Sequence, residues 1–572
     1  MGRQDNGNID PTLRALGSLG RYQMMQIAII SLSTIGSAYQ LLGNIFIGRH
    51  VTSYQCAGPG NDSSQATELS ALIFNSSHVT YGQCEITVSN DNFSSDAQQY
   101  PCVYGYDYEF RRDLSFRTEF DLVCDRKLLG GLAQTFVIMG QGIGAVIASA
   151  FSDRFGRKMV LVLSQLGLLT FGVAVGFAPS FSVLAVLKFM LGALQQGVVT
   201  TSVTMSLEMF PAEYRSLKTL IGSTFWGVCS ASLALLAYLM QDYNWRHLQF
   251  LLSAMSLVAV GQWWYVDESL RWLVANGKKE ATLKVLKRAA RTNRVDLDHV
   301  IKTLEASTTH EEMETLTNGD QHQDKDLPTQ VTSIPEVDEE LLHTLEEKQT
   351  KKLTLLDLFR NRRLLRNAAL MWFAWFTCAF TFFALYMMST SLHGDRFLNY
   401  FLTALMELPP SILFYLVVDR VGRKWATRPF FALAGLGLLC SGIFRMYAEN
   451  TAMRTLSVVS AMLGMVGASG MFGAIFFFTP ELFPTNMRTQ ALGVASLAGR
   501  CGGMIAPFMN NLADIAVWAP GALISSLCFL VVVVISFLPE TKGRELPNTV
   551  EDIELWYQAE EEKGDGNSTV TK

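Results

Sequence analysis

The stretch Ser152-Asp-Arg-Phe-Gly-Arg-Lys158 lies between two long apolar runs, and the chain repeats it as Asp419-Arg-Val-Gly-Arg-Lys424. In both copies a glycine stands between basic residues, a pattern typical of a tight cytoplasmic turn between two membrane helices. A single copy is equally well explained as a basic loop that only fixes topology. Two copies, each after an even-numbered apolar run, predict an internal repeat.

The composition indicates a membrane protein. Of the 572 residues, 49% are hydrophobic and 17% are charged, which is too apolar and too segmented for an ordinary soluble domain. Twelve runs reach the length of about 20 residues that a bilayer requires, and lipid-embedded backbone must be helical. The sequence therefore predicts an all-α membrane protein with twelve transmembrane helices. The predicted spans are 24–47, 128–151, 159–177, 181–204, 218–240, 247–266, 366–388, 397–418, 427–447, 455–478, 490–513 and 518–538.

Basic residues in the connectors predict the orientation. They cluster after even-numbered spans, as at Arg154, Arg215 and Arg488, so we expect both termini in the cytoplasm of a plasma-membrane protein. The polar N-terminus lacks a signal-peptide cleavage site, so the first span is expected to be retained. The resulting segments are a cytoplasmic N-terminus (1–23), the first span (24–47), an outside loop (48–127), an N-terminal bundle with spans two to six (128–266), a cytoplasmic loop (267–365), a C-terminal bundle (366–538) and a cytoplasmic tail (539–572).

The outside loop has the marks of a small folded, glycosylated cap. Four cysteines in an oxidising compartment predict two disulfides with three possible pairings. They are Cys56, Cys84, Cys102 and Cys124. Three glycosylation sequons begin at Asn61, Asn75 and Asn92, all in the one loop expected outside.

The cytoplasmic loop has two parts. Residues 278–291 are basic with apolar residues at helical spacing, which predicts a surface helix. Residues 308–349 are acidic and polar, so we expect disorder there and consider a docking segment for a cytoplasmic adaptor.

Two further motif pairs extend the repeat. Glu208-Met-Phe-Pro-Ala-Glu-Tyr-Arg215 matches Glu481-Leu-Phe-Pro-Thr-Asn-Met-Arg488, and Asp267-Glu-Ser-Leu-Arg271 matches Pro539-Glu-Thr-Lys-Gly-Arg544. With the opening pair, the offsets are 266, 273 and 272 positions. Each pair falls on one membrane side, which predicts two parallel six-helix repeats that rock around a central site.

Charged residues of these motifs are candidates for a cytoplasmic gate. Acids and arginines at helix ends could pair across the two halves when the inside is closed, although they could also only fix topology. The candidate gate residues are Asp153, Arg154, Gly156, Arg157, Lys158, Glu208, Arg215, Asp419, Arg420, Gly422, Arg423, Lys424, Glu481 and Arg488.

The motif set resembles that of the major facilitator superfamily. The long first loop with four cysteines, and the ending from Leu538 to Asp552, resemble the organic cation, carnitine and organic anion transporter family. The resemblance covers the chain from about Arg14 to Asp552, and it implies a secondary transporter of small organic solutes. The chain departs from the family at Asp267, where proline is usual, and at Lys188, where arginine is usual.

Two ionisable residues lie near the centres of predicted spans, Glu407 in the eighth and Arg500 in the eleventh. Each costs at least about 2.5–3.5 kcal/mol to insert, so each needs a partner or a wet cavity. They could form a structural ion pair, or they could read substrate charge. In the family, anion and zwitterion carriers tend to have arginine at the place of Arg500, and anion carriers often add a lysine where Ser411 stands. One acid and one arginine therefore favour a zwitterion such as a carnitine-like betaine.

Aromatic residues could complete that site through cation–π contacts with a quaternary ammonium group, although packing explains most rings in these spans. The candidates are Trp375, Phe376 and Phe382 of the seventh span and Phe225 and Trp226 of the fifth.

The sequence also bears on other functions. A Walker loop, paired zinc-ligand spacing, a nucleophile elbow and a basic arm are not found, so we expect no enzyme, cofactor, metal or nucleic-acid partner. A coupling ion, Na⁺ or H⁺, stays open, as does the oligomeric state. Two alternatives are an organic anion exchanger with Arg500 as its anchor, and a membrane sensor or scaffold without transport.

Overall fold

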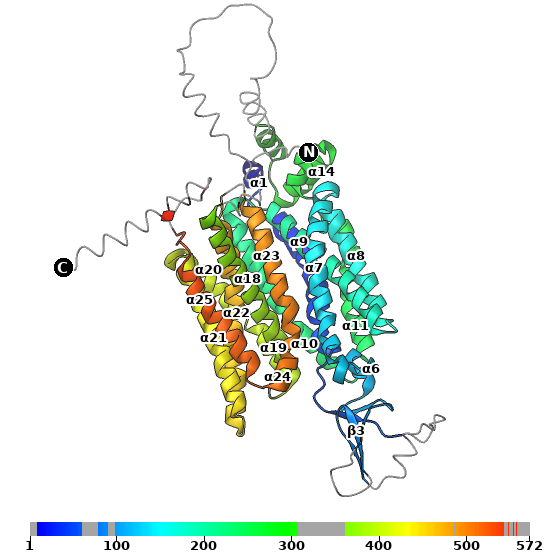
Figure 1. Ribbon diagram of the computed structural model, residues 1–572. Coiled ribbons are helices and arrows are strands. Elements are labelled where there is room, and N and C mark those ends of the chain that lie inside the picture. The colour runs from blue at the N-terminus through cyan, green and yellow to red at the C-terminus, as the bar shows by residue number, and fades with distance from the viewer. Residues whose placement is uncertain are drawn as a thin grey trace, which may run out of the picture.

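The computed structural model describes residues 9–59, 78–89, 98–306, 358, 361–484, 487–542, 547, 553, 556 and 557. Long helices form two groups that stand side by side (Figure 1), one from each half of the chain. Helices α1 (Asp10–Ala15) and α14 (Lys279–Asn293) lie at one end of the bundle, and the strands lie at the other. We call these the α14 end and the strand end.

Apolar runs form the helices of both groups. The first half contains α2 (Arg21–Ser31), α3 (Ser33–Leu42), α4 (Asn44–Ile47), α7 (Lys127–Phe155), α8 (Arg157–Gly176), α9 (Phe181–Glu208), α10 (Arg215–Leu239), α11 (Trp245–Ala254), the 3₁₀ turn η4 (Met255–Leu257) and α12 (Val258–Tyr265). The second half contains α18 (Arg362–Ser389), α19 (Arg396–Leu405), α20 (Leu408–Val421), α21 (Arg423–Met446), α22 (Thr451–Glu481), α23 (Arg488–Ile505), η5 (Ala506–Phe508), α24 (Met509–Ile515) and α25 (Ala519–Ser536).

Eleven of the described helices are long and apolar enough to cross a membrane. The sixth predicted span is not among these eleven, and it is formed by α11, η4 and α12. Together these three pieces still run continuously over 245–265, so twelve spans are present. The all-α fold with two parallel six-helix repeats is confirmed.

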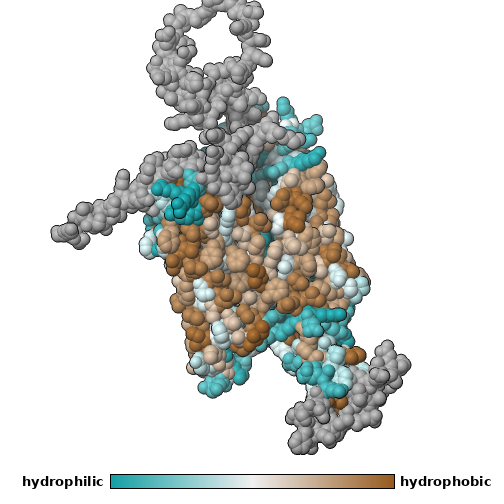
Figure 2. Space-filling view, viewed as in Figure 1, coloured by the Kyte–Doolittle hydropathy of each residue, from teal (hydrophilic) through white to brown (hydrophobic). Residues whose placement is uncertain are grey.

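The outer surface suits lipid. Figure 2 shows hydrophobic residues across the middle of the visible face and hydrophilic residues at its two ends. Large apolar side chains such as Val146, Leu235 and Leu416 are more than half exposed in the structure, at 73%, 60% and 55%. Such exposure would be unfavourable in water and marks a surface that lipid covers.

The strand end carries a small β cap, which the sequence did not predict as strands. Its strands are β1 (Tyr54–Cys56), β2 (His78–Tyr81), β3 (Glu85–Ser89), β4 (Gln98–Pro101) and β5 (Tyr106–Tyr108). β1 pairs with β5, and β3 stands between β2 and β4. Two disulfides, Cys56–Cys102 and Cys84–Cys124, confirm the predicted bridges and select one of the three pairings. Short strands on a polar loop would be marginal without such links.

The shorter helices complete the two ends. At the strand end η1 (Arg112–Leu114), α6 (Phe116–Glu119) and η2 (Cys124–Arg126) lead into α7. At the α14 end, η3 (Ala212–Tyr214) connects α9 to α10, and its Glu213 pairs with Arg14 of α1. At the α14 end, the predicted surface helix over 278–291 forms α14, which packs with α1 and α13 (Leu270–Ala275) around a small apolar core. The sequons at Asn61, Asn75 and Asn92 and the acidic stretch 308–349 lie outside the described residues.

Candidate functional site

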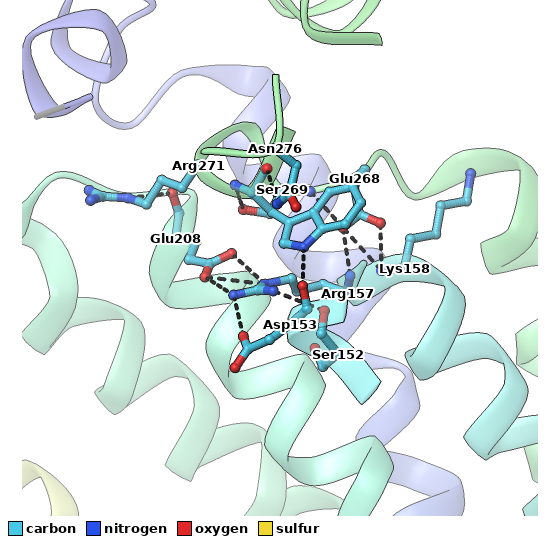
Figure 3. A network of polar contacts seen from close by, with 10 residues as sticks. Ser152, Asp153, Arg157, Lys158, Glu208, Glu268, Ser269, Arg271 and Asn276 are labelled. Atoms are coloured by element: carbon cyan, nitrogen blue, oxygen red, sulfur yellow. Dashed lines mark hydrogen bonds and ion pairs between the residues drawn. The ribbon is translucent and has the colours of Figure 1, made fainter. Parts of the chain in front are cut away.

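The repeated turn of the first half holds a network of charged groups (Figure 3). Arg157, the first residue of α8, binds both carboxylate oxygens of Glu208 at nitrogen–oxygen distances of 3.1–3.3 Å and lies 3.0 Å from the carboxylate of Asp153. The backbone N–H groups of Arg157 and Lys158 donate to Glu268, at 2.9 and 3.2 Å. Glu268 therefore caps the positive end of α8.

The second half builds the same network with the repeat-related residues. Arg423, the first residue of α21, binds both carboxylate oxygens of Glu481 at 3.1 Å. Glu540 accepts the backbone N–H groups of Arg423 and Lys424 at 2.9 and 3.2 Å. Matching residues thus make matching contacts in the two networks.

Both turns require glycine. Gly156 and Gly422 have φ of +100° and +103°, a region that side chains avoid. A Cβ atom would lie 2.4 Å from a carboxylate oxygen of Glu268 in the first turn, and 2.9 Å from the carboxylate of Glu540 in the second. The glycines therefore make room for the two capping acids.

The other predicted gate residues lie around these networks. Arg488 donates to the carbonyl of Pro480 at 2.8 Å, Arg154 stacks on Phe155, and the Arg420 carbonyl accepts a bond from Lys542. The side chains of Arg215 and Asp419 are not among those described.

The predicted gate pairs residues of opposite halves, whereas Arg157 and Arg423 bind acids of their own half in this structure. These contacts brace each half at the α14 end. Pairing across the halves stays a prediction for a state in which the α14 ends meet.

Contacts between the halves are present at the strand end. Asp514 of α24 lies 2.7 Å from the Lys127 ammonium and 3.2 Å from His50 Nε2, both in the first half. Deeper in the bundle, the hydroxyl of Thr135 donates to the carbonyl of Met504 at 2.8 Å. These contacts join the halves from the strand end toward the middle.

Arg500 lies on α23, near the middle of the eleventh predicted span (490–513), and its guanidinium group reaches across to the first half. One terminal nitrogen donates to the side-chain oxygen of Gln141 on α7. The other donates to the side-chain oxygen of Gln196 on α9, at 2.7 Å. The positive charge at mid-depth is therefore held by two neutral amide groups.

Glu407 lies at the break between α19 and α20. Pro409 and Pro410 follow it, and proline cannot donate a helical hydrogen bond, so the sequence itself divides the span here. The carboxylate is buried and accepts a hydrogen bond from the Tyr386 hydroxyl. In the described structure, Glu407 and Arg500 thus bind different groups, and the alternative of a structural ion pair between them is not what the structure adopts.

Glu407 also lies at the boundary between the halves. A Cβ atom on Gly227 of α10 would be 3.8 Å from the Cβ of Glu407 and 2.7 Å from a methyl carbon of Leu408. Tyr400 packs beside Tyr386, with ring centroids 5.5 Å apart. The acid is therefore enclosed by two phenol rings and the backbone of α10.

The predicted aromatic residues separate into two groups. Trp375 donates to the hydroxyl of Thr479 at 2.8 Å and is 2% exposed, which is a packing position against α22. Phe376 packs on Phe380, at 6.1 Å between centroids. Phe382 lies 5.2 Å from the Tyr386 ring, so it approaches the Glu407 region.

Phe225 and Trp226 precede Gly227 on α10 and are partly buried against the main core. Gly227 is the residue that meets Glu407. Of the predicted aromatic residues, Phe382 contacts the ring of Tyr386, which binds the acid, and these two directly precede the glycine that meets it.

Four residues at mid-depth were missed as site candidates from the sequence, namely Gln141, Gln196, Tyr386 and Tyr400. The glutamines carried a usable signal, because an amide in an apolar span needs a hydrogen-bond partner. The tyrosines carried none, since aromatic residues are abundant in the seventh and eighth spans.

Comparison with known families agrees with this architecture. A family model described as Major Facilitator Superfamily matches residues 126–507. The chain belongs to this superfamily of membrane transporters, and the resemblance inferred from its motifs is confirmed.

Curated relatives match over nearly the whole chain. An organic cation transporter-like protein of Drosophila melanogaster is 28% identical over 95% of this chain and 92% of its own length. Organic anion transporter 3 of Mus musculus is 28% identical, covering 96% and 94%. Solute carrier family 22 member 7 of Homo sapiens is 27% identical, covering 95% of each.

Solved structures share the fold. A partially occluded inward-open form of the xylose transporter XylE from E. coli has a TM-score of 0.57 at 14% identity, covering 92% of this chain and 100% of that one. The proton:xylose symporter XylE bound to 6-bromo-6-deoxy-D-glucose has a TM-score of 0.53 at 14% identity, covering 94% and 99%. At such identity the likeness concerns the fold alone.

Proposed function

We propose that this chain is a plasma-membrane secondary transporter that moves small organic zwitterions or cations by alternating access, with carnitine-like betaines favoured. One observation carries the proposal. An acid and an arginine, Glu407 and Arg500, lie at mid-depth in the second half, both meet the first half, and they bind different groups.

The chemistry of the two groups supports a zwitterion. An ionised group at mid-depth is expensive unless something compensates it. A betaine brings a quaternary ammonium group for Glu407 and a carboxylate for the guanidinium of Arg500, which can bind it through two nitrogens. Phe382, Phe225 and Trp226 stand on helices beside the acid, where aromatic faces can hold a quaternary ammonium.

The proposed orientation places the α14 end in the cytoplasm and the strand end outside. The disulfide-bonded cap supports it, because disulfides persist in oxidising compartments. The proposed alternating access follows from the architecture, because the two six-helix halves can rock around a site between them. In this state the contacts at the strand end would close the site to the outside, and the halves would separate at the α14 end to open it to the cytoplasm.

Radiotracer uptake in expressing cells tests the proposal. Labelled carnitine, tetraethylammonium and p-aminohippurate distinguish a zwitterion, a cation and an anion. We expect carnitine uptake in the wild type and its loss in Glu407→Gln and Arg500→Ala. Gln165→Ala is the control, because Gln165 is buried in the first half and its side-chain atoms have no described partner. Unchanged uptake of every accepted solute in both site variants would refute the site assignment.

An organic anion exchanger is the second candidate. The guanidinium of Arg500 is bound by two neutral amides, and relatives of this chain include proteins named organic anion transporters. In that case Arg500 anchors the anion and Glu407 is structural. Inhibition by dicarboxylates but not by betaines, with uptake unaffected by Glu407→Gln, would favour this function.

A further inference from the structure

Arg500 of the proposed site makes two side-chain hydrogen bonds to the opposite half. Its two donors go to Gln141 and Gln196, which lie on different helices of the first half. These two side-chain oxygens stand where a planar guanidinium binds the two oxygens of a carboxylate. Both glutamines are buried, at 1% and 9% exposure.

The glutamines are held in place by a chain of further bonds. Gln141 donates to the side-chain oxygen of Gln195 at 2.6 Å, and Gln195 donates to the hydroxyl of Ser37 at 2.8 Å. Gln196 donates to the hydroxyl of Thr200 at 3.0 Å. With their N–H₂ groups engaged, both glutamines present their oxygens to Arg500. Their orientation is therefore fixed by the first half.

The internal repeat shows what is unusual here. Gln141 and Glu407 are 266 positions apart, the same offset as Asp153 and Asp419. The repeat therefore matches Gln141 with the acid of the second half. An acid at this position would have neutralised Arg500, and an amide satisfies its hydrogen bonds without doing so.

The mirror position of Arg500 is also informative. Gly227 precedes Arg500 by 273 positions, the offset that separates Glu208 from Glu481. At Gly227 the two halves touch, and an added Cβ would already crowd Leu408. Arg500 thus contacts Gln141, the repeat partner of Glu407, and Glu407 lies against Gly227, the repeat partner of Arg500. Both partners in the first half are neutral.

We infer that Gln141 and Gln196 hold the place of the substrate's carboxylate, and that a carboxylate-bearing solute must displace them from Arg500 to bind. The inference rests on the proposed function and adds two specificity-determining residues to it. The two amides tie the halves together through Arg500 in the empty transporter. A carboxylate replaces them because it is a stronger acceptor for a guanidinium than an amide is.

The affinity for a zwitterion then depends on how firmly the amides hold Arg500. Loss of either acceptor leaves guanidinium donors open, so the carboxylate has less to displace. Conversely, an acid at position 141 would bind Arg500 permanently. A solute without a carboxylate makes no use of these donors and should be indifferent to them.

The test measures KM for labelled carnitine and for tetraethylammonium in cells expressing the full chain. We expect Gln141→Ala and Gln196→Ala each to lower the carnitine KM by about tenfold, the order of one hydrogen bond to a charged group. Gln141→Glu should raise the carnitine KM by about tenfold or more. The tetraethylammonium KM should stay within about twofold in all three. Gln165→Ala is the matched control on α8, outside the Arg500 network.

The possible results separate the inference from the proposed function. KM does not depend on how much protein reaches the surface, so a partial folding defect cannot imitate the expected shifts. A wild type that takes up neither probe refutes the proposed function and the inference with it. Wild-type carnitine uptake with an unchanged or raised KM in both alanine variants refutes the inference alone, since the glutamines would then be structural or would bind the substrate themselves.

Discussion

Residues related by the internal repeat are chemically alike at the α14 end and different in the middle of the bundle. At the α14 end, Arg157 and Glu208 in the first half make the same contacts as Arg423 and Glu481 in the second. In the middle, the repeat partners of Glu407 and Arg500 are Gln141 and Gly227. The ends of the two halves are alike in chemistry, and their centres are not.

The difference shows where the two halves share a task and where they do not. Each half must hold its own helix ends together, so the same turn and the same ion pair serve both. The proposed site for a zwitterion cannot be symmetric, because an ammonium group and a carboxylate need opposite partners. Both charges lie in the second half, and the first half supplies amides, rings and close backbone.

The largest expected effect comes from the paired glycines. Gly156→Ala and Gly422→Ala place a side chain at a φ of about +100° and against a capping carboxylate. We expect each to lower stability by about 3 kcal/mol. Thermal unfolding in detergent measures this, with Gly261→Ala as the control because a Cβ there meets nothing within 4 Å. Tolerance of only one of the two alanines would break the equivalence of the ends.

At the middle, Arg500→Ala should reduce carnitine uptake by about thirtyfold, equal to about 2 kcal/mol of lost binding. Its mirror change, Gly227→Ala, should leave charge recognition intact and act only through the crowding of Leu408. We therefore expect Gly227→Ala to affect carnitine and tetraethylammonium equally. If Arg500→Ala reduced the uptake of carnitine and of tetraethylammonium equally, the charge of Arg500 would not be what distinguishes the two solutes.

The arginines of the two ends provide the next comparison. Arg157→Ala and Arg423→Ala each leave a partly buried acid without its main partner. The side chain of Arg157 is 11% exposed and that of Arg423 is 22% exposed. Allowing for solvent screening, we expect losses of about 1.5 kcal/mol, slightly more for Arg157. Unfolding midpoints of the two variants, measured side by side, check the ranking. A loss of stability in only one of the two variants would show that the networks do not stabilise their halves equally.

The smallest expected effect concerns pH and Glu268. Burial raises the pKa of Glu268, and the N–H bonds from Ser269, Lys158 and Arg157 oppose that rise only in part. A raised pKa means that the folded chain holds the proton more tightly than the unfolded chain. This contribution to stability is present at low pH and is lost as the pH rises from about 4.5 through the raised pKa.

Glu268→Gln should therefore flatten the fall of the unfolding midpoint with pH while keeping an acceptor for the N–H groups of α8. Midpoints between about pH 4.5 and 7 measure it. Glu540→Gln is the matched change in the second turn, and comparing the slopes extends the test of equivalence to energetics. An unchanged slope in Glu268→Gln would contradict the assigned role of its burial.

Several features of the fold could be predicted from local sequence. The twelve spans, the two turns around Gly156 and Gly422, and the helix at 278–291 were predicted because each depends on neighbours along the chain. The sixth span was found as an apolar run although its helix is interrupted at η4. The residues of the networks at the α14 end were singled out from their motifs. The structure joins them within each half, and pairing across the halves stays a prediction.

The sequence by itself determined that this protein crosses a membrane twelve times in two parallel repeats, because each segment in lipid must satisfy its own backbone and bury its own apolar surface. It also placed one acid and one arginine at mid-depth. Only the tertiary structure decided which cysteines are bridged and which groups hold Glu407 and Arg500. Those partners lie on helices far apart in the chain, and the rotation and packing of each helix set which side chains meet.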